Sequence, residues 1–441
     1  MKKKRFFKQC VIEFLEYSIM PDKKILIIGG NVGENAACLK PSYSVELFDP
    51  NIKDMDIPAK ADNPDIIFVK SSVLDFESDV VFDYIIFYES LNYEGDLYKI
   101  FTKLKRLMHR DTKIFVLEVN PLLLFVLKIL HALGLITPPL SRNMLALGDL
   151  ENLVNVFGFD TLDQGYRLLV PFKLMGLRDI VNSILARIPY LRHFCFGQYI
   201  IFRLHPLEEG HQSLSCSVVV PCYNEEGNIR ECISRIPNFG LWREIVVVND
   251  GSKDRTEAIV REMMNGRSDI RLITYEKNGG KGYAVNRGWQ ESKGDVLMML
   301  DCDSTTPPEE MVLFHDAIEK GAEFVNGTRV IYPREKHSIP FLNRLGVSFF
   351  AHLISWITQK RITDTFCGTK VFLKKHWSYF QIKEFLWGDW DLFFTAARYR
   401  MKMVEIPVHY KTRKFGETKM RPLKHGSILL LKSMEGLKVI K

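Results

Sequence analysis

Short apolar runs recur along this chain, and most of them lead directly into a turn that carries glycine, aspartate or asparagine. Stretches whose apolar residues have helical spacing separate these runs. An alternation of buried strands with helices builds α/β domains around a parallel sheet. Open sheets of this kind bind ligands at the carboxyl ends of their strands. We therefore expect doubly wound α/β architecture, with functional residues in the turns that follow strands.

The chain is long enough for two domains. Its 441 residues exceed the usual size of a single hydrophobic core. Residues 205–213 are polar and contain Pro206 and Gly210, which is typical of a linker. Each side of this segment begins its own series of strands and helices. We predict a first domain over residues 1–206, a linker over 207–213 and a second domain over 214–441.

The composition says more about the cellular compartment of the protein than about its binding partners. The net charge of +7 permits nucleotides, phosphates or an acidic membrane surface as partners but identifies none of them, and we expect no nucleic acid. The eight cysteines include no Cys-x-x-Cys pair, which favours buried free thiols in a reducing compartment over disulfides or zinc. We therefore expect a cytoplasmic protein, with peripheral contact to the cytoplasmic face of a membrane as an open alternative.

We expect neither a signal peptide at the start of the chain nor a membrane-spanning helix at residues 121–136. The basic start of the chain is followed by Lys8 and Glu13, so an amphipathic helix is expected there instead of a signal peptide. Residues 121–136 are apolar but are interrupted by Lys128 and are shorter than the roughly 20 residues of a span. A buried or interfacial helix is the preferred interpretation.

The first half of the chain predicts a nucleotide-type sheet. Expected strands cover residues 24–28, 44–49, 65–69, 84–87 and 113–118, with a closing pair near 166–170 and 198–202. A glycine-rich turn containing Gly29 and Gly33 follows the first strand, and Asp49 ends the second. Such a turn lets the backbone approach a nucleotide-like ligand, and the acid can bind a ribose hydroxyl.

This order resembles that of class I S-adenosylmethionine-dependent methyltransferases, over roughly residues 20–204. The resemblance implies a Rossmann-like methyltransferase fold, in which Gly29, Gly33 and Asp49 line an S-adenosylmethionine site and Asp75 lies near the adenine. Two positions depart from the family pattern: Ile27 replaces the usual acid, and Asn31 replaces the middle glycine. An active methyltransferase and a degenerate domain that supports its neighbour are both open.

The second half places polar turns after four expected strands. The strands cover residues 216–220, 244–248, 270–275 and 296–300, and the turns begin at Pro221, Asn249, Asn278 and Asp301. Asp301 and Asp303 are two residues apart after the last strand, so both carboxylates can reach one divalent cation and its diphosphate. Asp-x-Asp is common by chance, but four such turns in order indicate an enzyme acting on a nucleotide-activated sugar.

These turns resemble those of family 2 glycosyltransferases with the GT-A fold, over nearly all of residues 214–424. The resemblance implies that Asp303 ligates Mg²⁺ or Mn²⁺ with help from Asp301. It also implies a nucleotide-sugar site formed by Pro221, Tyr223, Glu225, Asp250, Lys281 and Asp301.

The remainder resembles the polyprenyl-phosphate group of this family, which includes dolichyl-phosphate mannose synthases. The resemblance implies inverting transfer of a sugar to a lipid phosphate. Arg413 and Lys419 match phosphate-holding residues, and Arg329 is a suitable partner for diphosphate. Asp391 matches an acid on the acceptor side, where it acts as a base, orients Arg413 or the acceptor, or caps a helix.

Several alternatives stay open. The acceptor can be a glycan or another lipid, and methylation can be the main activity. The last helix, with apolar residues 428–431, either lies on an anionic membrane surface or closes the core. The sequence does not identify the sugar, the choice between GDP- and UDP-sugar donors, or the oligomeric state.

Overall fold

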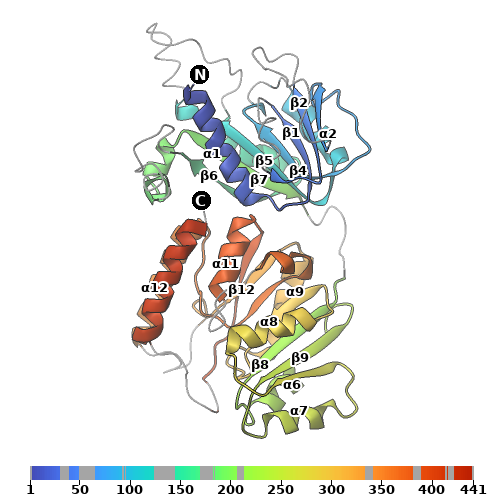
Figure 1. Ribbon diagram of the computed structural model, residues 1–441, viewed down its shortest axis with the longest axis vertical. Coiled ribbons are helices and arrows are strands. Elements are labelled where there is room, and N and C mark those ends of the chain that lie inside the picture. The colour runs from blue at the N-terminus through green and yellow to red at the C-terminus, as the bar shows by residue number, and fades with distance from the viewer. Residues whose placement is uncertain are drawn as a thin grey trace. The chain divides into compact units, whose positions relative to one another are not determined.

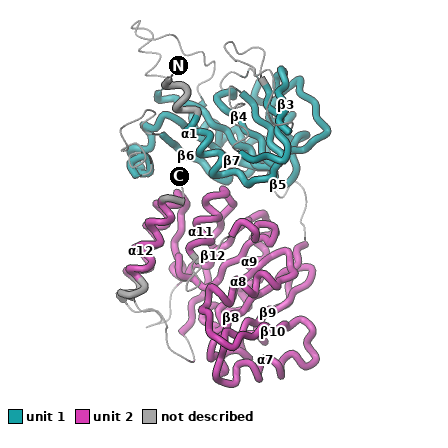
Figure 2. The backbone as a smooth tube through the Cα atoms, viewed as in Figure 1, with its two compact units in different colours: residues 1–210, 441 teal, residues 211–440 magenta. Residues whose placement is uncertain are grey.

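The structure, a computed structural model, forms two compact units, which are residues 1–210 with residue 441 and residues 211–440 (Figure 2). Each unit is an α/β structure built on one seven-stranded sheet (Figure 1). The described residues are 2–29, 39–48, 65–91, 94, 96–123, 145–168, 182, 184–205, 213–332, 341–380, 389–412, 415 and 422–439.

The sheet of the first unit has the strand order β3-β2-β1-β4-β5-β7-β6. Strands β1 to β5 are parallel to one another, whereas β7 is antiparallel to both β5 and β6. The sheet is therefore mixed, which corrects the expectation of a parallel sheet at its closing edge. The strands are β1 (Lys24–Ile28), β2 (Tyr43–Phe48), β3 (Ile66–Lys70), β4 (Phe82–Tyr88), β5 (Met108–Val119), β6 (Phe159–Arg167) and β7 (Gly197–Leu204).

Helices pack against both faces of this sheet. Ile27 of β1 lies in one buried cluster with Leu15 of helix α1, and Leu26 lies in another with Ile100 of α2. Successive strand residues point to opposite faces, so a continuous apolar strand requires a cover on each side. The predicted amphipathic helix at the start of the chain is confirmed. The helices are α1 (Lys2–Ser18), α2 (Leu97–Leu104) and α4 (Leu147–Val156).

Strand β6 begins earlier than the sequence predicts. The expected strand near residues 166–170 overlaps β6 only at Tyr166 and Arg167. Leu168 has a φ of 67°, in the left-handed region, so the extended strand stops before it. Residues 169 and 170 of the expected strand lie outside the described residues. The buried apolar side chains of β6 are Phe159 and Leu162.

The sheet of the second unit has the order β10-β9-β8-β11-β13-β12-β14. The first four strands in this order are parallel, and β13 is antiparallel to β11 and β12. The expectation of a parallel sheet is therefore correct for β8 to β11 and wrong at β13. The strands are β8 (Cys216–Cys222), β9 (Arg243–Asp250), β10 (Ile270–Tyr275), β11 (Val296–Met299), β12 (Phe324–Thr328), β13 (Lys370–Leu373) and β14 (Met403–Pro407).

Helices also cover both faces of the second sheet. Ile233 of α6 and Phe314 of α9 pack with the buried strand residues on one face. On the other face α8 lies very close to the strands, because a Cβ at Gly288 would be 2.4 Å from a methyl carbon of Val219. The helices are α6 (Ile229–Arg235), α7 (Thr256–Met264), α8 (Lys281–Glu291), α9 (Met311–Glu319), α10 (Phe341–Thr358), α11 (Asp389–Arg398) and α12 (Pro422–Val439).

Helices α10, α11 and α12 contact one another within the second unit. Phe350 of α10 and Trp390 of α11 have ring centroids 5.2 Å apart. Gly436 of α12 lies against the ring of Phe394, where a Cβ would be 2.3 Å from the nearest ring carbon. Among the described helices, none has the length and hydropathy needed to cross a bilayer.

Candidate active site

Four neighbouring parallel strands of the second unit end at one edge of its sheet. Their registers pair Cys222 of β8 with Asn249 of β9, and Asp250 of β9 with Tyr275 of β10. Strand β11 lies in parallel on the other side of β8. The turns that follow these strands therefore meet at the carboxyl edge, as the sequence predicts.

Asp250 lies beneath the turn that leads into α8. Its Oδ1 accepts a hydrogen bond from the Gly279 N–H, and its Oδ2 accepts one from the Gly280 N–H, both at 2.8 Å. The side chain of Asn278 donates to the Asp250 carbonyl oxygen at 3.1 Å. A carboxylate has about four acceptor positions, so these bonds fix Asp250 without exhausting it. Asp250 therefore links the end of β9 to the start of α8.

Lys281 and Asp301 form an ion pair across this edge. The Lys281 Nζ is 2.8 Å from Asp301 Oδ1, and both side chains are partly exposed. On the other side of the carboxylate, a Cβ built on Gly368 would be 1.8 Å from Asp301 Oδ2. Asp301 is therefore held between an ammonium group and a position that only glycine can occupy.

Asp303 is buried and lies two residues further along. Its Oδ1 accepts hydrogen bonds from the Thr305 N–H at 3.1 Å and the Thr305 hydroxyl at 2.8 Å. Cys302, between the two aspartates, is buried in the core with Cys232. The thiol of Cys302 is therefore packed in the core, while Asp301 is partly exposed at the edge.

The turns after β8 and β9 are joined by reciprocal hydrogen bonds. The Asn224 N–H donates to the Ser252 hydroxyl at 2.9 Å, and the Lys253 N–H donates to Asn224 Oδ1 at 2.8 Å. Asn224 has a φ of 54°, a conformation that asparagine adopts more readily than most residues. These bonds connect the turn that contains Pro221 and Tyr223 to the turn after Asp250. Pro221 and Tyr223, which are predicted to bind the nucleotide-sugar, are both half-buried.

Glu225 is held by the helix that follows it, and Phe415 lies close by. The Asn228 side chain donates to Glu225 Oε2 at 2.7 Å and to the Phe415 carbonyl oxygen at 3.5 Å. A Cβ on Gly227 would be 3.0 Å from the Phe415 ring. Phe415 therefore contacts the turn after β8, whereas the predicted phosphate-binding residues Arg413 and Lys419 lie outside the described residues.

Arg329 pairs with a buried aspartate that the sequence did not single out. Its Nε is 2.6 Å from Asp364 Oδ2, and its Nη2 is 2.9 Å from Oδ1. Burial opposes ionisation of Asp364, but the charge and hydrogen bonds of Arg329 outweigh it and hold the pKa of this carboxyl below its ordinary value. Burial also disfavours the Arg329 cation, yet Asp364 raises the pKa of Arg329. Arg329, which is predicted to bind the diphosphate, is thus anchored to Asp364 through the Nε and Nη2 edge of its guanidinium.

Asp391, in the first turn of α11, pairs with a residue of the last helix. The Lys432 Nζ is 3.0 Å from Asp391 Oδ1, and both side chains are largely buried. The sequence did not predict that Lys432 pairs with Asp391, because Lys432 is one of several cationic residues on α12. The ion pair connects α11 to α12 directly.

The predicted cofactor residues of the first unit are only partly described. Gly29 has a φ of 102°, and a Cβ there would be 2.4 Å from the Tyr88 carbonyl oxygen and 2.5 Å from the Ser90 Cβ. Gly29 is therefore closely packed against the end of β4. Asp75 accepts a hydrogen bond from the Ser72 hydroxyl at 2.7 Å on the surface. Gly33 and Asp49 lie outside the described residues.

A metal at this edge would depend on substrate oxygens as well as protein. No cluster of three or more His, Cys, Asp or Glu side chains able to hold a metal occurs in the part of the chain that the structure describes. Asp301 and Asp303 supply two carboxylates after one strand, and Mg²⁺ is commonly bound by one or two carboxylates together with phosphate oxygens. The donor set therefore fits a hard cation that is shared with a diphosphate.

Comparison with known proteins identifies the second unit. Residues 217–400 match the family described as glycosyl transferase family 2. The dolichyl-phosphate hexose transferase of Haloferax volcanii is 32% identical over 213 residues, which are 48% of this chain and 90% of that protein. The dolichol-phosphate mannosyltransferase of Pyrococcus furiosus is 35% identical over 153 residues, which are 34% of this chain. This chain spans only 43% of the length of the Pyrococcus furiosus protein.

A solved structure of glucosyl-3-phosphoglycerate synthase from Mycobacterium tuberculosis, in complex with Mn²⁺, uridine diphosphate and glucosyl-3-phosphoglycerate, is also similar. It is 18% identical with a TM-score of 0.40, and the match covers 54% of this chain and 83% of that chain. The family match over 217–400 and the alignment with nearly the whole Haloferax volcanii protein agree with the strand-edge geometry. The chain belongs to glycosyl transferase family 2.

Proposed function

We propose that the second unit transfers a sugar from a GDP- or UDP-sugar to a polyprenyl or dolichyl phosphate, with inversion and with a divalent metal. The observation that carries this proposal is the meeting of Asp250, Lys281, Asp301 and Asp303 at one sheet edge. The names of the Haloferax volcanii and Pyrococcus furiosus relatives support a lipid phosphate as the acceptor.

The nucleotide-sugar would occupy the turns after β8, β9 and β10. Pro221, Tyr223 and Glu225 would surround the base and ribose, and Asp250 would bond one of them. The Asp250 carboxylate is fixed by two N–H donors, so a ligand would meet a preorganised acceptor. Lys281 and Asp301 would complete the nucleotide pocket at the diphosphate end.

Mg²⁺ or Mn²⁺ would be held by Asp303, with Asp301 acting directly or through bound water. When bound, the cation neutralises charge that develops on the departing nucleoside diphosphate. Lys281 is already beside Asp301 at 2.8 Å and would add a fixed positive charge to the same end of the donor.

A phosphate acceptor reduces the chemical demand on the protein. A phosphate oxygen attacks the anomeric carbon from the face opposite the diphosphate, and the bond between the sugar and diphosphate breaks. No proton must be removed, because a phosphate monoester is already ionised near neutral pH, so the residues mainly position it and shield its charge. We assign this task to Arg329, Arg413 and Lys419.

The location of Phe415 supports that assignment. It lies between Arg413 and Lys419 in the sequence and contacts the turn after β8 through Asn228 and Gly227. Asp391 is the remaining candidate. Because its carboxylate faces Lys432, we propose that it positions α11 on the acceptor side and is not the base that accepts a proton.

A radiolabelled transfer assay tests the proposed reaction. GDP-mannose and UDP-glucose, each labelled in the sugar, are offered with dolichyl or undecaprenyl phosphate and Mn²⁺ or Mg²⁺. We expect label in the lipid fraction with one donor, and at least about a hundredfold loss in Asp303→Ala. Asp316→Ala, which removes an exposed carboxylate of α9 paired with Lys320, is the matched control and should retain activity.

The same assay distinguishes the main alternative. A family 2 glycosyltransferase acting on a glycan or another lipid would leave the phosphate lipids unlabelled. Label found in an added glycan or diacylglycerol, and absent from dolichyl and undecaprenyl phosphate, would support that alternative and contradict our acceptor.

For the first unit we propose a class I methyltransferase-like domain over residues 1–206, followed by a linker at 207–213 and the transferase domain at 214–441. The strand order with β7 antiparallel between β5 and β6 supports the proposal, as does the tight turn at Gly29. Gly33, Asp49 and Asp75 would complete an S-adenosylmethionine site. Calorimetry with S-adenosylmethionine tests this cofactor: heat with a single-site isotherm supports an active domain, and none at millimolar ligand supports the degenerate form.

We also propose peripheral contact with the cytoplasmic face of a membrane through α12. Leu429 and Ser433 are buried against the neighbouring helices, whereas Leu430, Leu431 and Met434 are exposed. One side of the helix thus closes the core and another presents apolar residues, which suits an interfacial position. Flotation with anionic vesicles tests this: Leu431→Ser with Met434→Ser should reduce binding several-fold, and equal binding would contradict it.

A further inference from the structure

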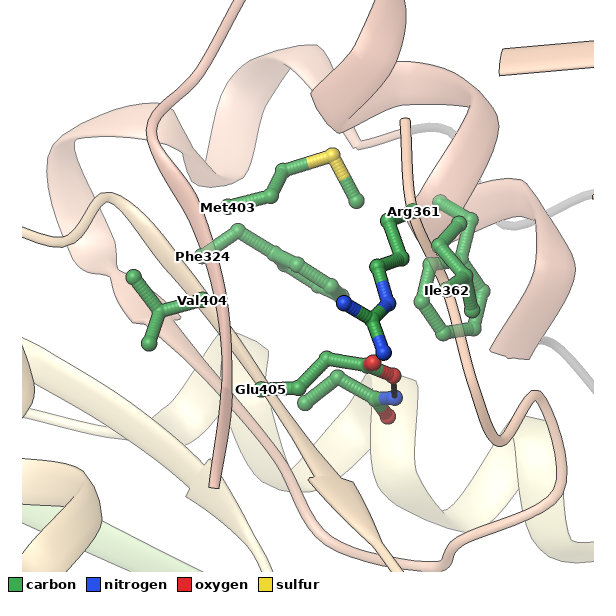
Figure 3. Close-up of a pocket in the computed structure, with 8 residues that line it drawn as sticks. Phe324, Arg361, Ile362, Met403, Val404 and Glu405 are labelled. Carbon is green, nitrogen blue, oxygen red and sulfur yellow. Dashed lines mark hydrogen bonds between the residues drawn. The ribbon is translucent and has the colours of Figure 1, made fainter. Parts of the chain in front are cut away.

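A cavity of about 210 Å³ lies in the second unit (Figure 3). It involves Phe324 and Met403, the first residues of β12 and β14, which pair in register. The donor turns lie instead at the carboxyl ends of β8 to β11. The lining residues are Phe324, Asn326, Arg361, Ile362, Phe393, Met403, Val404 and Glu405.

Asn326 presents a buried acceptor in this lining. Its side-chain Nδ2 donates to the Asp364 carbonyl oxygen and to Glu405 Oε1, both at 2.8 Å. Both partners accept only, so the amide cannot be turned around, and the nitrogen must face them. Asn326 is 1% exposed, and within the described part of the chain no donor reaches its Oδ1. A buried acceptor of this kind requires a donor from a ligand or water.

Arg361 supplies the positive charge in the lining of the same cavity, and Glu405 supplies a negative one. Arg361 is a solvent-exposed residue. Its side chain extends into the space lined by Phe324, Ile362 and Met403 (Figure 3). Among the described residues no ion-pair partner of Arg361 is found. A guanidinium binds carboxylates and phosphates through two parallel hydrogen bonds, so Arg361 is the group in this lining that can bind an anion.

Glu405 is occupied by the protein. Its Oε2 accepts from the Thr363 N–H at 2.9 Å and from the Thr363 hydroxyl at 2.8 Å, while Oε1 accepts from Asn326. These bonds hold the segment that continues to Asp364, the partner of Arg329. The carboxylate therefore anchors this segment and leaves Arg361 to meet a ligand.

We propose that the cavity binds a small organic anion with an apolar body and one hydrogen-bond donor. The anion would pair with Arg361, the donor would reach Asn326 Oδ1, and the body would lie against Phe324, Phe393 and Met403. The volume is smaller than the roughly 300 Å³ of the smallest typical ligand pockets, and water takes about 30 Å³ in the liquid, so the ligand is small. Asn326 of the lining donates to the carbonyl oxygen of Asp364, and the carboxylate of Asp364 pairs with Arg329.

Calorimetric titration of the full chain, without sugar donor or metal, tests this site. 4-Hydroxyphenylacetate carries the anion, the aromatic body and the hydroxyl donor. Phenylacetate lacks the donor, and tyramine replaces the anion with a cation. We expect 4-hydroxyphenylacetate to bind, phenylacetate to bind about tenfold more weakly, and tyramine not to bind.

Variants separate this site from general binding. Arg361→Gln should weaken 4-hydroxyphenylacetate by about tenfold or more, while Lys360→Gln, a neighbour outside the lining, should leave it unchanged. Equal binding of all three probes, equal binding by Arg361→Gln, or no binding of 4-hydroxyphenylacetate at millimolar concentration would overturn the proposal and leave water as the partner of Asn326. Because no sugar donor is present, the result is independent of the proposed transfer reaction.

Discussion

The ammonium group of Lys281 lies 2.8 Å from the carboxylate of Asp301, at the edge where four parallel strands end. The opposite side of that carboxylate lies against Gly368, where a Cβ would be 1.8 Å from Oδ2. Three segments, from the start of α8, the end of β11 and the turn before β13, therefore fix one side chain. Asp301 has little freedom to move without disturbing the two segments beside it.

Gly368→Ala should displace Asp301. The added methyl group cannot share space with the carboxylate, so we expect at least about a tenfold loss of sugar transfer, because small misplacements at a reacting centre are costly. The measurement is kcat/KM for sugar transfer. Gly346→Ala is the matched control, because a Cβ at this position in α10 meets no atom within 4 Å. Equal activity in both variants would contradict the tight placement of Asp301.

Asp364→Asn should destabilise the second unit by about 3–5 kcal/mol at neutral pH, since it leaves the Arg329 charge buried without its partner. The pKa of Asp364 is depressed in the folded chain, so the ionised form stabilises the fold above the ordinary value of 3.8. This contribution is lost as pH falls through the lower folded pKa. Urea unfolding from pH 7 to pH 3 should therefore show the gap between wild type and variant closing only at the acid end.

Glu309→Gln serves as the control for that experiment. It removes the carboxylate of an ion pair with Arg235 whose Nε–Oε1 distance is 2.8 Å but whose Glu309 side chain is 53% exposed. An exposed pair contributes roughly 0–1 kcal/mol, so its loss should be small. A stability loss for Asp364→Asn no larger than that of Glu309→Gln would show that the pair of Arg329 and Asp364 stabilises the fold no more than an exposed ion pair does.

Local patterns located the strands well, because runs of β-branched and apolar residues such as 244–248 favour buried strands. They placed some strand ends too early, since β9 continues through the buried polar residues Asn249 and Asp250. The convergence of the turns that contain Asp250 and Gly279 followed from the parallel order, but the hydrogen bond between these two residues was not predicted. Neither Gly368 beside Asp301 nor Lys432 beside Asp391 could be predicted, since the residues of each pair are far apart in sequence and are joined by tertiary packing. The family match supports the expected glycosyltransferase fold, and the methyltransferase fold of the first unit stays a prediction.

Asp391→Asn should retain turnover within about tenfold of wild type, because a phosphate acceptor needs no general base, whereas loss of such a base typically costs about a hundredfold or more. The variant should instead lose stability, as should Lys432→Met, because each breaks the largely buried pair between α11 and α12. Single-turnover transfer and thermal unfolding separate the two effects. A large loss of turnover in Asp391→Asn alone would restore the role of a base.

The described cysteines should resist alkylation in the native protein, with Cys10 as the exception. Burial raises the pKa of Cys195 and of Cys216 to about 12, so little reactive thiolate forms at neutral pH. Iodoacetamide labelling at pH 8 with peptide mapping should modify half-buried Cys10 and spare Cys195, Cys216, Cys222, Cys232, Cys302 and Cys367. Labelling of all of them in urea is the control. Rapid native labelling of Cys302 would contradict its packing behind the aspartates.

The most direct test of the account is donor binding at Asp303. Thermal unfolding is measured with GDP- and UDP-sugars, each with Mn²⁺, Mg²⁺ or a chelator, on wild type, Asp303→Ala and Asp316→Ala. We predict that one donor class stabilises the wild type and Asp316→Ala only when metal is present, and that Asp303→Ala loses this stabilisation. Stabilisation of Asp303→Ala equal to that of wild type, or no stabilisation of the wild type by any donor, would contradict a metal-dependent nucleotide-sugar site at this edge of the sheet.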